Sequence, residues 1–357
     1  MKPKVLLIQS VLFRYREPIY RIMSEQVDLT LAYTNRCEIE DSSYTIIKLP
    51  SFKIGPLTIH RHVNRILNQY DVVILLPHLN FIRLNMIAFQ KHKYKLVTWS
   101  IGLHVSYNKH YDLNVEPTFK DKVFEAIQDR ADACIFYMPE PIEYWKKHKN
   151  INIEKYFVAH NTVAVEPFIK LPDFTTKDSL LFVGTLYKQK GIGELMEACA
   201  IAKKKVGRIP KLDIVGKGPE KDSIENQIHE LGLEGDVNLC GPIFDDKILK
   251  EYFFKSILCI SPKQAGLSVL KSLGYGVPFV TRTDAITGGE KSNIIDKENG
   301  LFYDSVDELA NIIADTITNP NKYEIMCQNA RNYYLNNATP EKMAQGALDA
   351  ISYALSH

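Results

Sequence analysis

The chain has 357 residues, of which 45% are hydrophobic and 24% charged, and its 44 Lys and Arg nearly balance 42 Asp and Glu. This balance is typical of a folded globular protein and excludes a disordered, collagen-like or highly charged chain. The length predicts two domains, each large enough to bury its own core. The six cysteines form no close pair in the sequence, which favours reduced thiols in a cytosolic protein.

The apolar run at residues 5–8 is too short for a signal peptide, so we interpret it as a buried strand. No apolar stretch approaches the roughly 20 residues that cross a bilayer, and we expect any membrane contact to be peripheral. Charge is uneven: residues 1–160 hold 22 Lys and Arg against 16 Asp and Glu, and eight of the ten histidines. This indicates either two ordinary solvated surfaces or a basic half that faces an anionic acceptor or an acidic membrane.

Short apolar runs alternate with longer helical patterns, which is typical of parallel sheets covered by helices. Most runs are apolar on both faces, as strands buried on two sides require. The expected strands of the first half are Val5–Gln9, Leu29–Tyr33, Val72–Leu76, Leu96–Trp99, Ala133–Tyr137 and Tyr156–Ala159. Those of the second half are Leu180–Val183, Leu212–Val215, Val237–Cys240, Leu258–Ser261 and Pro278–Thr281.

The break between the halves is expected near residues 161–178, which contain two prolines and no sustained period. We therefore predict an α/β protein with two Rossmann-like, doubly wound domains at residues 1–165 and 166–338. The domains would face each other across a cleft at the carboxyl ends of the strands, where open α/β sheets bind ligands.

The segment Leu181–Gly191 is predicted to form a strand, a short loop and the start of a helix. Gly184 ends the strand where a ligand can approach the backbone, and Lys190 precedes a helix amino end that attracts anions. A cation at that position suits a diphosphate. The segment is neither a Walker loop nor a GxGxxG fingerprint, which argues against a nucleoside triphosphatase or an ordinary dehydrogenase. A plain strand-to-helix turn is the alternative.

Two later segments have the same pattern of strand, loop and helix. In Leu212–Glu220 the turn contains Gly216, and the helix starts with proline and glutamate. In Cys259–Val280 the loop carries Lys263 and the helix carries Lys271. If that loop folds back over the helix start, both ammonium groups reach one cleft; two solvated lysines are the alternative interpretation.

The order of these motifs resembles the retaining GT-B glycosyltransferases of family 4, also called group 1. The resemblance covers residues of about 160 to 320 and rests on Gly184-x5-Lys190-Gly, Val215-Gly-x-Gly-Pro, Ser261-Pro-x3-Gly266-Leu267, Gly276-Val-Pro and Asn299-Gly-Leu. It implies a nucleotide-diphosphate sugar donor that is held mainly by the second domain, with UDP or GDP as the favoured nucleotide. The acceptor would be held mainly by the first domain. It also implies no metal ion or other cofactor, and a C-terminal helix at 339–357 that crosses back to the first domain.

This chain departs from the family pattern at three positions. Lys263 and Lys271 stand where the family usually has a Glu-x7-Glu pair, and Thr185 stands where it usually has arginine. In the family the second glutamate normally binds the donor ribose and the first contacts the sugar. Lys263 is a candidate to replace the arginine, because an ammonium-to-phosphate contact is charge-assisted and worth about 1.5 to 3 kcal/mol. Lys271 cannot accept hydrogen bonds from ribose hydroxyls, because an ammonium group only donates.

By the same resemblance, the loop that begins at Gly241 covers the base, with Ile243 packed on it. Asp245 or Asp246 is expected to cap the helix that follows this loop. The full set of donor-site candidates in the second half is Gly184, Thr185, Lys190, Gly216, Gly241, Ile243, Lys263, Gly266, Leu267 and Lys271.

In the first half, Arg14 and Arg16 follow the first strand, and arginine is a planar fork for phosphate. They suit a donor phosphate, an acceptor or simply a solvated loop. By the same resemblance, His104 is the candidate for a histidine near the transferred sugar, with His78 second, although a lone histidine is more often structural. The basic stretches 89–95 and 144–149 have two interpretations: they contact anionic lipid head groups, or they only keep a helix soluble.

Together with the resemblance, these observations favour a cytoplasmic, metal-independent hexosyltransferase that acts on a carbohydrate or lipid-linked acceptor in bacterial capsule or O-antigen synthesis, with no nucleic-acid partner. Transfer with retention is implied by the resemblance alone. His104, Lys190 and Lys263 are the candidate catalytic residues; the two lysines would neutralise charge that develops on the leaving diphosphate. A noncatalytic GT-B subunit that binds a partner or a glycan is the main rival. A nucleotide-sugar 2-epimerase on the same fold would need paired carboxylates in the cleft, and the sequence contains no convincing pair.

Overall fold

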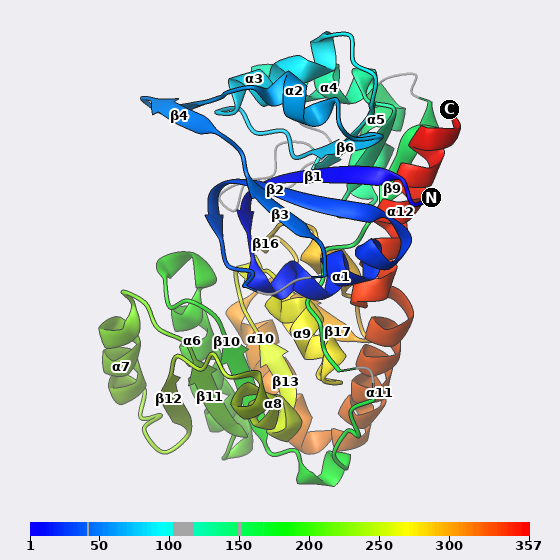
Figure 1. The fold of residues 1–357 in the computed structure, drawn as a ribbon. Helices are drawn as coiled ribbons and strands as arrows, with labels where there is room; N and C mark the ends of the chain where they lie inside the picture. Colours follow the sequence, from blue (N-terminus) through cyan, green and yellow to red (C-terminus); the bar gives the residue numbers. More distant parts are fainter. Residues whose placement is uncertain (41–42, 103–117, 149–151, 167) are drawn as a thin grey trace. The chain divides into compact units, whose positions relative to one another are not determined.

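The computed structural model describes residues 1–40, 43–102, 118–148, 152–166 and 168–357, which divide into two compact units (Figure 1). The described part of unit 1 lies within 1–102, 118–164 and 340–357, and that of unit 2 within 165–339. Each unit is built around a parallel sheet with helices on both faces. The chain therefore has an α/β architecture with two large parallel sheets, as its alternating apolar runs predict.

Unit 1 contains a seven-stranded sheet in the order β3-β2-β1-β6-β7-β8-β9. Its strands are β1 (Lys4–Leu12), β2 (Asp28–Cys37), β3 (Thr45–Lys48), β6 (Val72–Leu75), β7 (Lys95–Ser100), β8 (Ala133–Phe136) and β9 (Tyr156–Val158). All neighbouring strands pair in parallel. The six strands predicted for the first half are confirmed, and β3 is an additional edge strand that the sequence pattern did not indicate.

Side chains of β1 alternate between two buried layers. Val5 and Leu7 pack with α1 (Glu17–Gln26) and α12 (Pro340–Ser356), whereas Leu6 and Ile8 pack with the helices on the other face. Those helices are α2 (Val63–Leu67), α3 (Ile82–Met86), α4 (Phe119–Arg130) and α5 (Glu140–His148). Burial on both faces is the physical reason why the strands of this sheet are continuously apolar.

The C-terminal helix α12 belongs to unit 1, in contact with α1 and with strands β7 to β9. A Cβ atom at Gly346 would lie 2.3 Å from the backbone oxygen of Val158 on β9, so glycine permits this close approach. This position of the last helix agrees with the fold that the resemblance implies.

An antiparallel hairpin, β4 (Ser51–Ile54) with β5 (Leu57–His60), extends from unit 1 beside α3 (Figure 1). Short 3-10 turns complete the unit: η1 (Arg14–Arg16) after β1, η2 (Ile87–Phe89) after α3 and η3 (Ile153–Lys155) before β9. Neither strand of the hairpin was predicted from the sequence, and all four residues of β4 are exposed.

Unit 2 contains a six-stranded parallel sheet in the order β12-β11-β10-β13-β15-β17. The strands are β10 (Ser179–Val183), β11 (Lys211–Val215), β12 (Val237–Gly241), β13 (Ser256–Ile260), β15 (Phe279–Arg282) and β17 (Gly300–Tyr303). The five strands predicted for the second half are confirmed, and β17 was not predicted. The first strand of the unit, β10, lies between β11 and β13, so the strand order reverses there.

Helices cover both faces of this sheet. The main core cluster joins β10 and β13 to α6 (Ile192–Val206), α7 (Lys221–Glu230), α10 (Val306–Thr318) and α11 (Pro320–Asn337). The helices α8 (Asp246–Lys255) and α9 (Ser268–Gly274) contact β10, β13 and β15. The remaining short elements are η4 (Phe174–Thr176), η5 (Lys188–Lys190), β14 (Gln264–Ala265), β16 (Ile286–Thr287) and η6 (Glu290–Asn293).

Candidate functional site

The candidate site lies at the carboxyl edge of the unit 2 sheet, where the strand order reverses between β10 and β13. Ligands of open α/β sheets bind at such switch points. Three predicted glycines meet there, because they end adjacent strands: the Gly184 amide donates to the Val215 oxygen at 3.0 Å, and the Gly216 amide to the Gly241 oxygen at 2.9 Å. The edge thus presents backbone with little side-chain cover.

Gly216 is required by packing. A Cβ atom built on it would lie 1.9 Å from the backbone oxygen of Gly184, which no real side chain tolerates. The glycine therefore allows the loops that follow β10 and β11 to pack closely. Its predicted role in substrate binding stays a prediction, while its role in shaping the edge follows from this contact.

Lys190 is the cation at this edge. It ends η5, only 8% of it is exposed, and its Nζ donates to the Gln264 backbone oxygen at 3.5 Å. A Cβ atom at Gly184 would lie 3.7 Å from this Nζ, so the ammonium group lies directly against the glycine. Burial lowers the pKa of Lys190 to about 8, and the negative charge of Glu290 partly opposes that shift. Lys190 is thus a desolvated ammonium group beside open backbone.

Glu290 is a functional candidate that the sequence analysis missed. It is fully buried at the start of η6, and its carboxylate accepts hydrogen bonds from the Gly288 amide at 2.9 Å and the Thr287 hydroxyl at 3.2 Å. The signal available in the sequence is a single glutamate after two glycines. Its position near Lys190 depends on β16 folding beside β14, which no local pattern indicates.

Hydrogen bonds tie the loops after β10 and β13 together. Tyr187 donates its hydroxyl to the Gln264 side-chain oxygen at 2.6 Å, and the Lys263 amide donates to the Lys190 backbone oxygen at 3.2 Å. The Ser261 hydroxyl donates to the Gln264 backbone oxygen at 2.8 Å and holds the turn. Tyr187 and Gln264 are further site residues that the sequence analysis did not single out.

The side chain of Lys263 lies against the start of α6. It packs over Gly191, where a Cβ atom would meet Lys263 Cγ at 2.8 Å, and its Nζ lies 3.4 Å from Glu194 on the first turn of α6. Glu194 also pairs with Arg282 at 3.0 Å. Lys263 is predicted from the sequence to hold phosphate, whereas in the structure its charge is matched by the Glu194 carboxylate.

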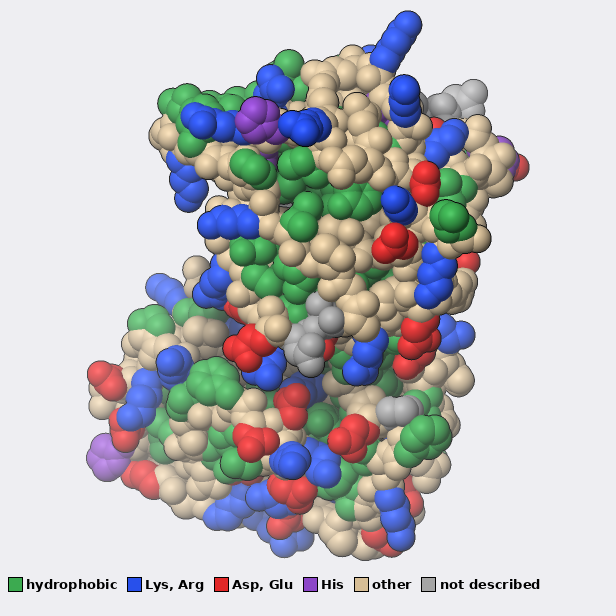
Figure 2. Space-filling model, in the orientation of Figure 1, with side chains coloured by type: hydrophobic (Ala, Val, Ile, Leu, Met, Phe, Trp, Pro, Cys, Tyr) green, Lys and Arg blue, Asp and Glu red, His purple; other side chains and the backbone are tan. Residues whose placement is uncertain are grey.

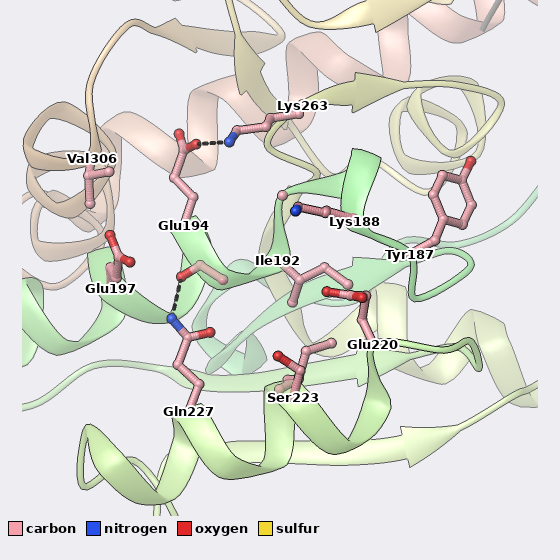
Figure 3. A pocket seen from close by; sticks show the side chains of 13 residues that line it. Tyr187, Lys188, Ile192, Glu194, Glu197, Glu220, Ser223, Gln227, Lys263 and Val306 are labelled. Carbon is pink, nitrogen blue, oxygen red and sulfur yellow. Dashed lines mark hydrogen bonds and ion pairs between the residues drawn. The ribbon is translucent and has the colours of Figure 1, made fainter. Parts of the chain in front are cut away.

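Lys263 lines a pocket of about 300 Å³ beside the helix starts of α6 and α7 (Figure 3). Figure 3 shows that three carboxylates line this pocket, on Glu194, Glu197 and Glu220, together with two lysines, Lys188 and Lys263. A diphosphate placed here would meet an excess of negative charge. The open backbone beside Lys190 suits an anion better than this pocket does.

Lys271 on α9 forms an ion pair with Asp246 on the first turn of α8. The sequence analysis places one of the two aspartates at the helix cap; the cap is Asp245, whose carboxylate accepts from the Lys247 amide at 2.8 Å. The side chain of Lys271 is therefore paired with a carboxylate.

The remaining donor-site candidates are Thr185, Ile243, Gly266 and Leu267. Thr185 is exposed, and Ile243 and Leu267 are half-buried. A Cβ atom at Gly266 would meet nothing within 4 Å. These residues are accessible, and their predicted contacts with a donor stay predictions.

The two arginines that the sequence suggests as site residues in unit 1 have opposite environments. Arg14 is exposed, whereas Arg16 is buried, with Nη2 donating to the Asn161 side chain at 3.2 Å and the guanidinium 5.0 Å from the centre of the Tyr137 ring. In unit 1, His78 stacks on Phe81, and burial lowers its pKa. His104 lies outside the described residues.

Within the described residues, no group of three or more His, Cys, Asp and Glu side chains is placed to hold a metal ion. In that same part of the chain, no helix is both long and apolar enough to cross a membrane.

Residues 166–333 match the family whose model is described as Glycosyl transferases group 1. Among curated proteins, the chain is similar to an uncharacterized glycosyltransferase of Haemophilus influenzae, with 28% identity over 157 residues that form 43% of this chain and 43% of that protein. The match thus spans less than half the length of that relative. The matched family region is nearly the whole of unit 2, which contains the candidate site.

Among solved structures, Anabaena HepE in complex with UDP has a TM-score of 0.69 at 15% identity, over 98% of this chain and 99% of that one. The lipopolysaccharide outer core galactosyltransferase WaaB, in its apo form, also has a TM-score of 0.69, at 17% identity and with the same coverage. At these identities the likeness concerns the fold. The chain has an α/β fold of two Rossmann-like units, similar to that of the GT-B glycosyltransferases.

Proposed function

We propose that this protein is a glycosyltransferase that moves a sugar from a nucleotide-diphosphate sugar to a glycan or lipid-linked acceptor. The observation that carries the proposal is Lys190, a buried ammonium group against the open backbone of Gly184, inside the region that matches the group 1 family. UDP is the proposed nucleotide, because a structural relative is bound to UDP. Bacterial surface polysaccharide is the proposed pathway, supported by the likeness to a lipopolysaccharide galactosyltransferase.

In this proposal the diphosphate lies beside Lys190 and the backbone of Gly184. The buried ammonium group of Lys190 stabilises its negative charge. Charge grows on the diphosphate as the bond to the sugar breaks, so a preorganised cation there lowers the barrier. Transfer of a hexose with retention, and without a metal ion, rests on the family resemblance.

Unit 1 is the proposed acceptor-binding domain, and residues 166–338 are the proposed donor-binding domain. Arg14, exposed at the end of β1, and the half-buried His78 are available in unit 1 for acceptor contacts. We propose that the protein acts at the cytoplasmic face of the membrane, with peripheral contact and without a nucleic-acid partner.

The proposal is tested by donor binding and donor hydrolysis. Calorimetry with UDP and GDP, and with their sugars, should reveal micromolar or tighter binding, and Lys190→Ala should weaken it by about 1.5 to 3 kcal/mol, which is the scale of a charge-assisted hydrogen bond. Lys188→Ala, an exposed lysine of the same 3-10 turn, is the matched control. Equal losses for both variants would refute the assignment of Lys190. Turnover that EDTA abolishes and Mg²⁺ restores would refute metal independence.

A noncatalytic subunit of the same fold is the second candidate, and the ion pairs of Lys263 and Lys271 favour it. Both lysines stand at positions where the family usually has glutamates, and each is paired with a carboxylate. Absence of nucleotide binding together with tight binding of a glycan would support this candidate. Hydrolysis of the donor in the absence of an acceptor would exclude it.

A further inference from the structure

The segment 51–95 of unit 1 has an unusual charge content. It contains seven Lys and Arg, four His and one acidic residue, Asp71. Asp71 accepts a hydrogen bond from the Lys4 amide at 2.8 Å, and Lys95 pairs with Asp132 at 3.3 Å. The six remaining cations are exposed and have no ion pair in the part of the chain that the structure describes: Lys53, Arg61, Arg65, Arg83, Lys91 and Lys93.

The same segment exposes four large apolar side chains. Phe52 and Ile54 on β4 are 39% and 59% exposed, and Met86 and Phe89 at the end of α3 and in η2 are 47% and 53% exposed. An isolated apolar side chain on a surface is ordinary, but four within one basic segment call for an explanation. We call these four side chains and the six unpaired cations the basic apolar face.

Contacts connect the elements that carry this face. The Arg61 guanidinium lies 4.8 Å from the centre of the Phe52 ring, and the Asn64 side chain of α2 donates to Gln90 at 3.1 Å. Helix α3 contacts β5, and β5 pairs with β4. Figure 1 shows β4, α2 and α3 side by side on unit 1, and Figure 2 shows basic, histidine and hydrophobic side chains interspersed over them.

The turns from α3 to η2 have a buried apolar inner side and an outer side that also carries large apolar residues. Leu84, Ile87 and Ala88 are buried in the core, as the inner side of a surface helix requires. Arg83, Met86 and Phe89 follow one another at intervals of three residues, so they share the outer side, and all three are exposed. An outer side that combines arginine with large apolar residues is typical of elements that lie in a membrane interface.

We propose that the basic apolar face binds the surface of an anionic phospholipid membrane. Its cations would lie at the level of the phosphates, and Ile54, Met86 and Phe89 would enter the boundary between head groups and acyl chains. A nucleic acid or an acidic protein segment would engage the cations but would leave these apolar side chains in water. The combination therefore favours a lipid surface over either.

This inference rests on the proposed function, because membrane binding would bring the enzyme to a lipid-linked acceptor, which is held at such a surface. The binding itself needs no sugar donor and no turnover. A failure of lipid binding is therefore distinguishable from a failure of the proposed transfer reaction, which donor binding and donor hydrolysis test.

The experiment is flotation of the full chain with phosphatidylcholine vesicles, with and without phosphatidylglycerol, at low and high salt. We expect binding that requires phosphatidylglycerol and weakens as salt rises. The triple variant Arg83→Glu, Lys91→Glu, Lys93→Glu should lose affinity by at least about a hundredfold, since each cation near such a surface contributes roughly fivefold. Phe89→Ser combined with Met86→Ser should lower affinity at both salt concentrations.

Matched controls are available on unit 2. Lys204→Glu, Arg208→Glu and Lys221→Glu make the same charge change at exposed cations that form no ion pair within the described residues, and Ile325→Ser removes another exposed apolar side chain. Thermal unfolding and UDP binding should be unchanged in every variant. If a combined variant unfolds, the lipid and salt dependence of the unaltered chain and the single change Phe89→Ser still decide the question.

Three results would overturn the inference. The first is equal binding to vesicles with and without phosphatidylglycerol, or no binding to either. The second is an equal loss of affinity in the unit 2 control variant. The third is binding to duplex DNA, or to a polyglutamate peptide, that exceeds binding to phosphatidylglycerol vesicles at the same concentration of negative charge.

Discussion

Lys271 and Asp246, which are 25 residues apart, join the helices α9 and α8 by an ion pair at the carboxyl edge of the unit 2 sheet. The lysine side chain is 20% exposed and the aspartate side chain 71% exposed. The pair therefore brings an accessible carboxylate to a position where the sequence alone places only an ammonium group. A carboxylate accepts hydrogen bonds from hydroxyls, which Lys271 cannot do.

We expect Asp246→Asn to weaken UDP binding about fivefold to tenfold, because a hydrogen bond from a ribose hydroxyl to a charged acceptor is lost. The loss should be smaller for the 2′-deoxy nucleotide. Asp222→Asn, at the exposed first turn of α7, is the control and should have no effect. Calorimetry with both nucleotides checks this, and an equal loss for the two would show that Asp246 does not contact the ribose.

Donor affinity should fall as pH rises through the pKa of Lys190. Burial lowers that pKa to about 8, so the ammonium form predominates below pH 8 and is lost above it. The diphosphate of a nucleotide sugar stays ionised throughout, and only the protonated lysine attracts it. We expect about a tenfold loss of affinity between pH 7 and pH 9. Lys190→Ala should abolish this dependence; the same slope in that variant would assign it to another group.

Lys263→Glu should destabilise unit 2. The change places a carboxylate beside Glu194, which is largely buried and also pairs with Arg282. Because Lys263 is half exposed, solvent and salt screen the repulsion, and we expect a loss of about 1 kcal/mol in the free energy of unfolding. In a Glu194→Gln background the loss should disappear, which chemical denaturation can measure.

The neutral variant Lys263→Gln separates the two interpretations of this lysine. If the Lys263 ammonium group stays paired with Glu194 when UDP binds, UDP affinity should be unchanged in this variant. If the ammonium group contacts the bound diphosphate instead, UDP affinity should fall by about tenfold or more. A fall that salt reduces would support the phosphate role that the sequence analysis predicts.

Gly216→Ala should disrupt the edge of the sheet. Its new methyl group would overlap the backbone oxygen of Gly184, which cannot move without shifting β10. We expect a loss of about 1 to 3 kcal/mol in stability, together with weaker nucleotide binding. Gly235→Ala is the control, because a Cβ atom there meets nothing within 4 Å. Similar melting temperatures for the two variants would contradict the packing role of Gly216.

The sequence alone determined most of the two sheets. A parallel strand buried on both faces needs a continuous apolar run, and such runs are visible without any knowledge of the partner strands. The three glycines that end β10, β11 and β12 were visible for a similar reason, since each marks the end of its own strand. The strands that were not predicted include β3 and β17, which are edge strands of the two large sheets, and β4, which belongs to a separate hairpin and is exposed.

Only the tertiary structure decided which side chains meet. Arg14 and Arg16 are two residues apart, yet one is exposed and the other buried against Asn161, a residue 145 positions away. Lys263 and Lys271 look alike in the sequence, and their carboxylate partners come from different helices. Glu290 reaches the vicinity of Lys190 only because β16 pairs with β14. Local patterns report burial of a segment, whereas the charge balance of a site depends on contacts between distant segments that those patterns do not encode.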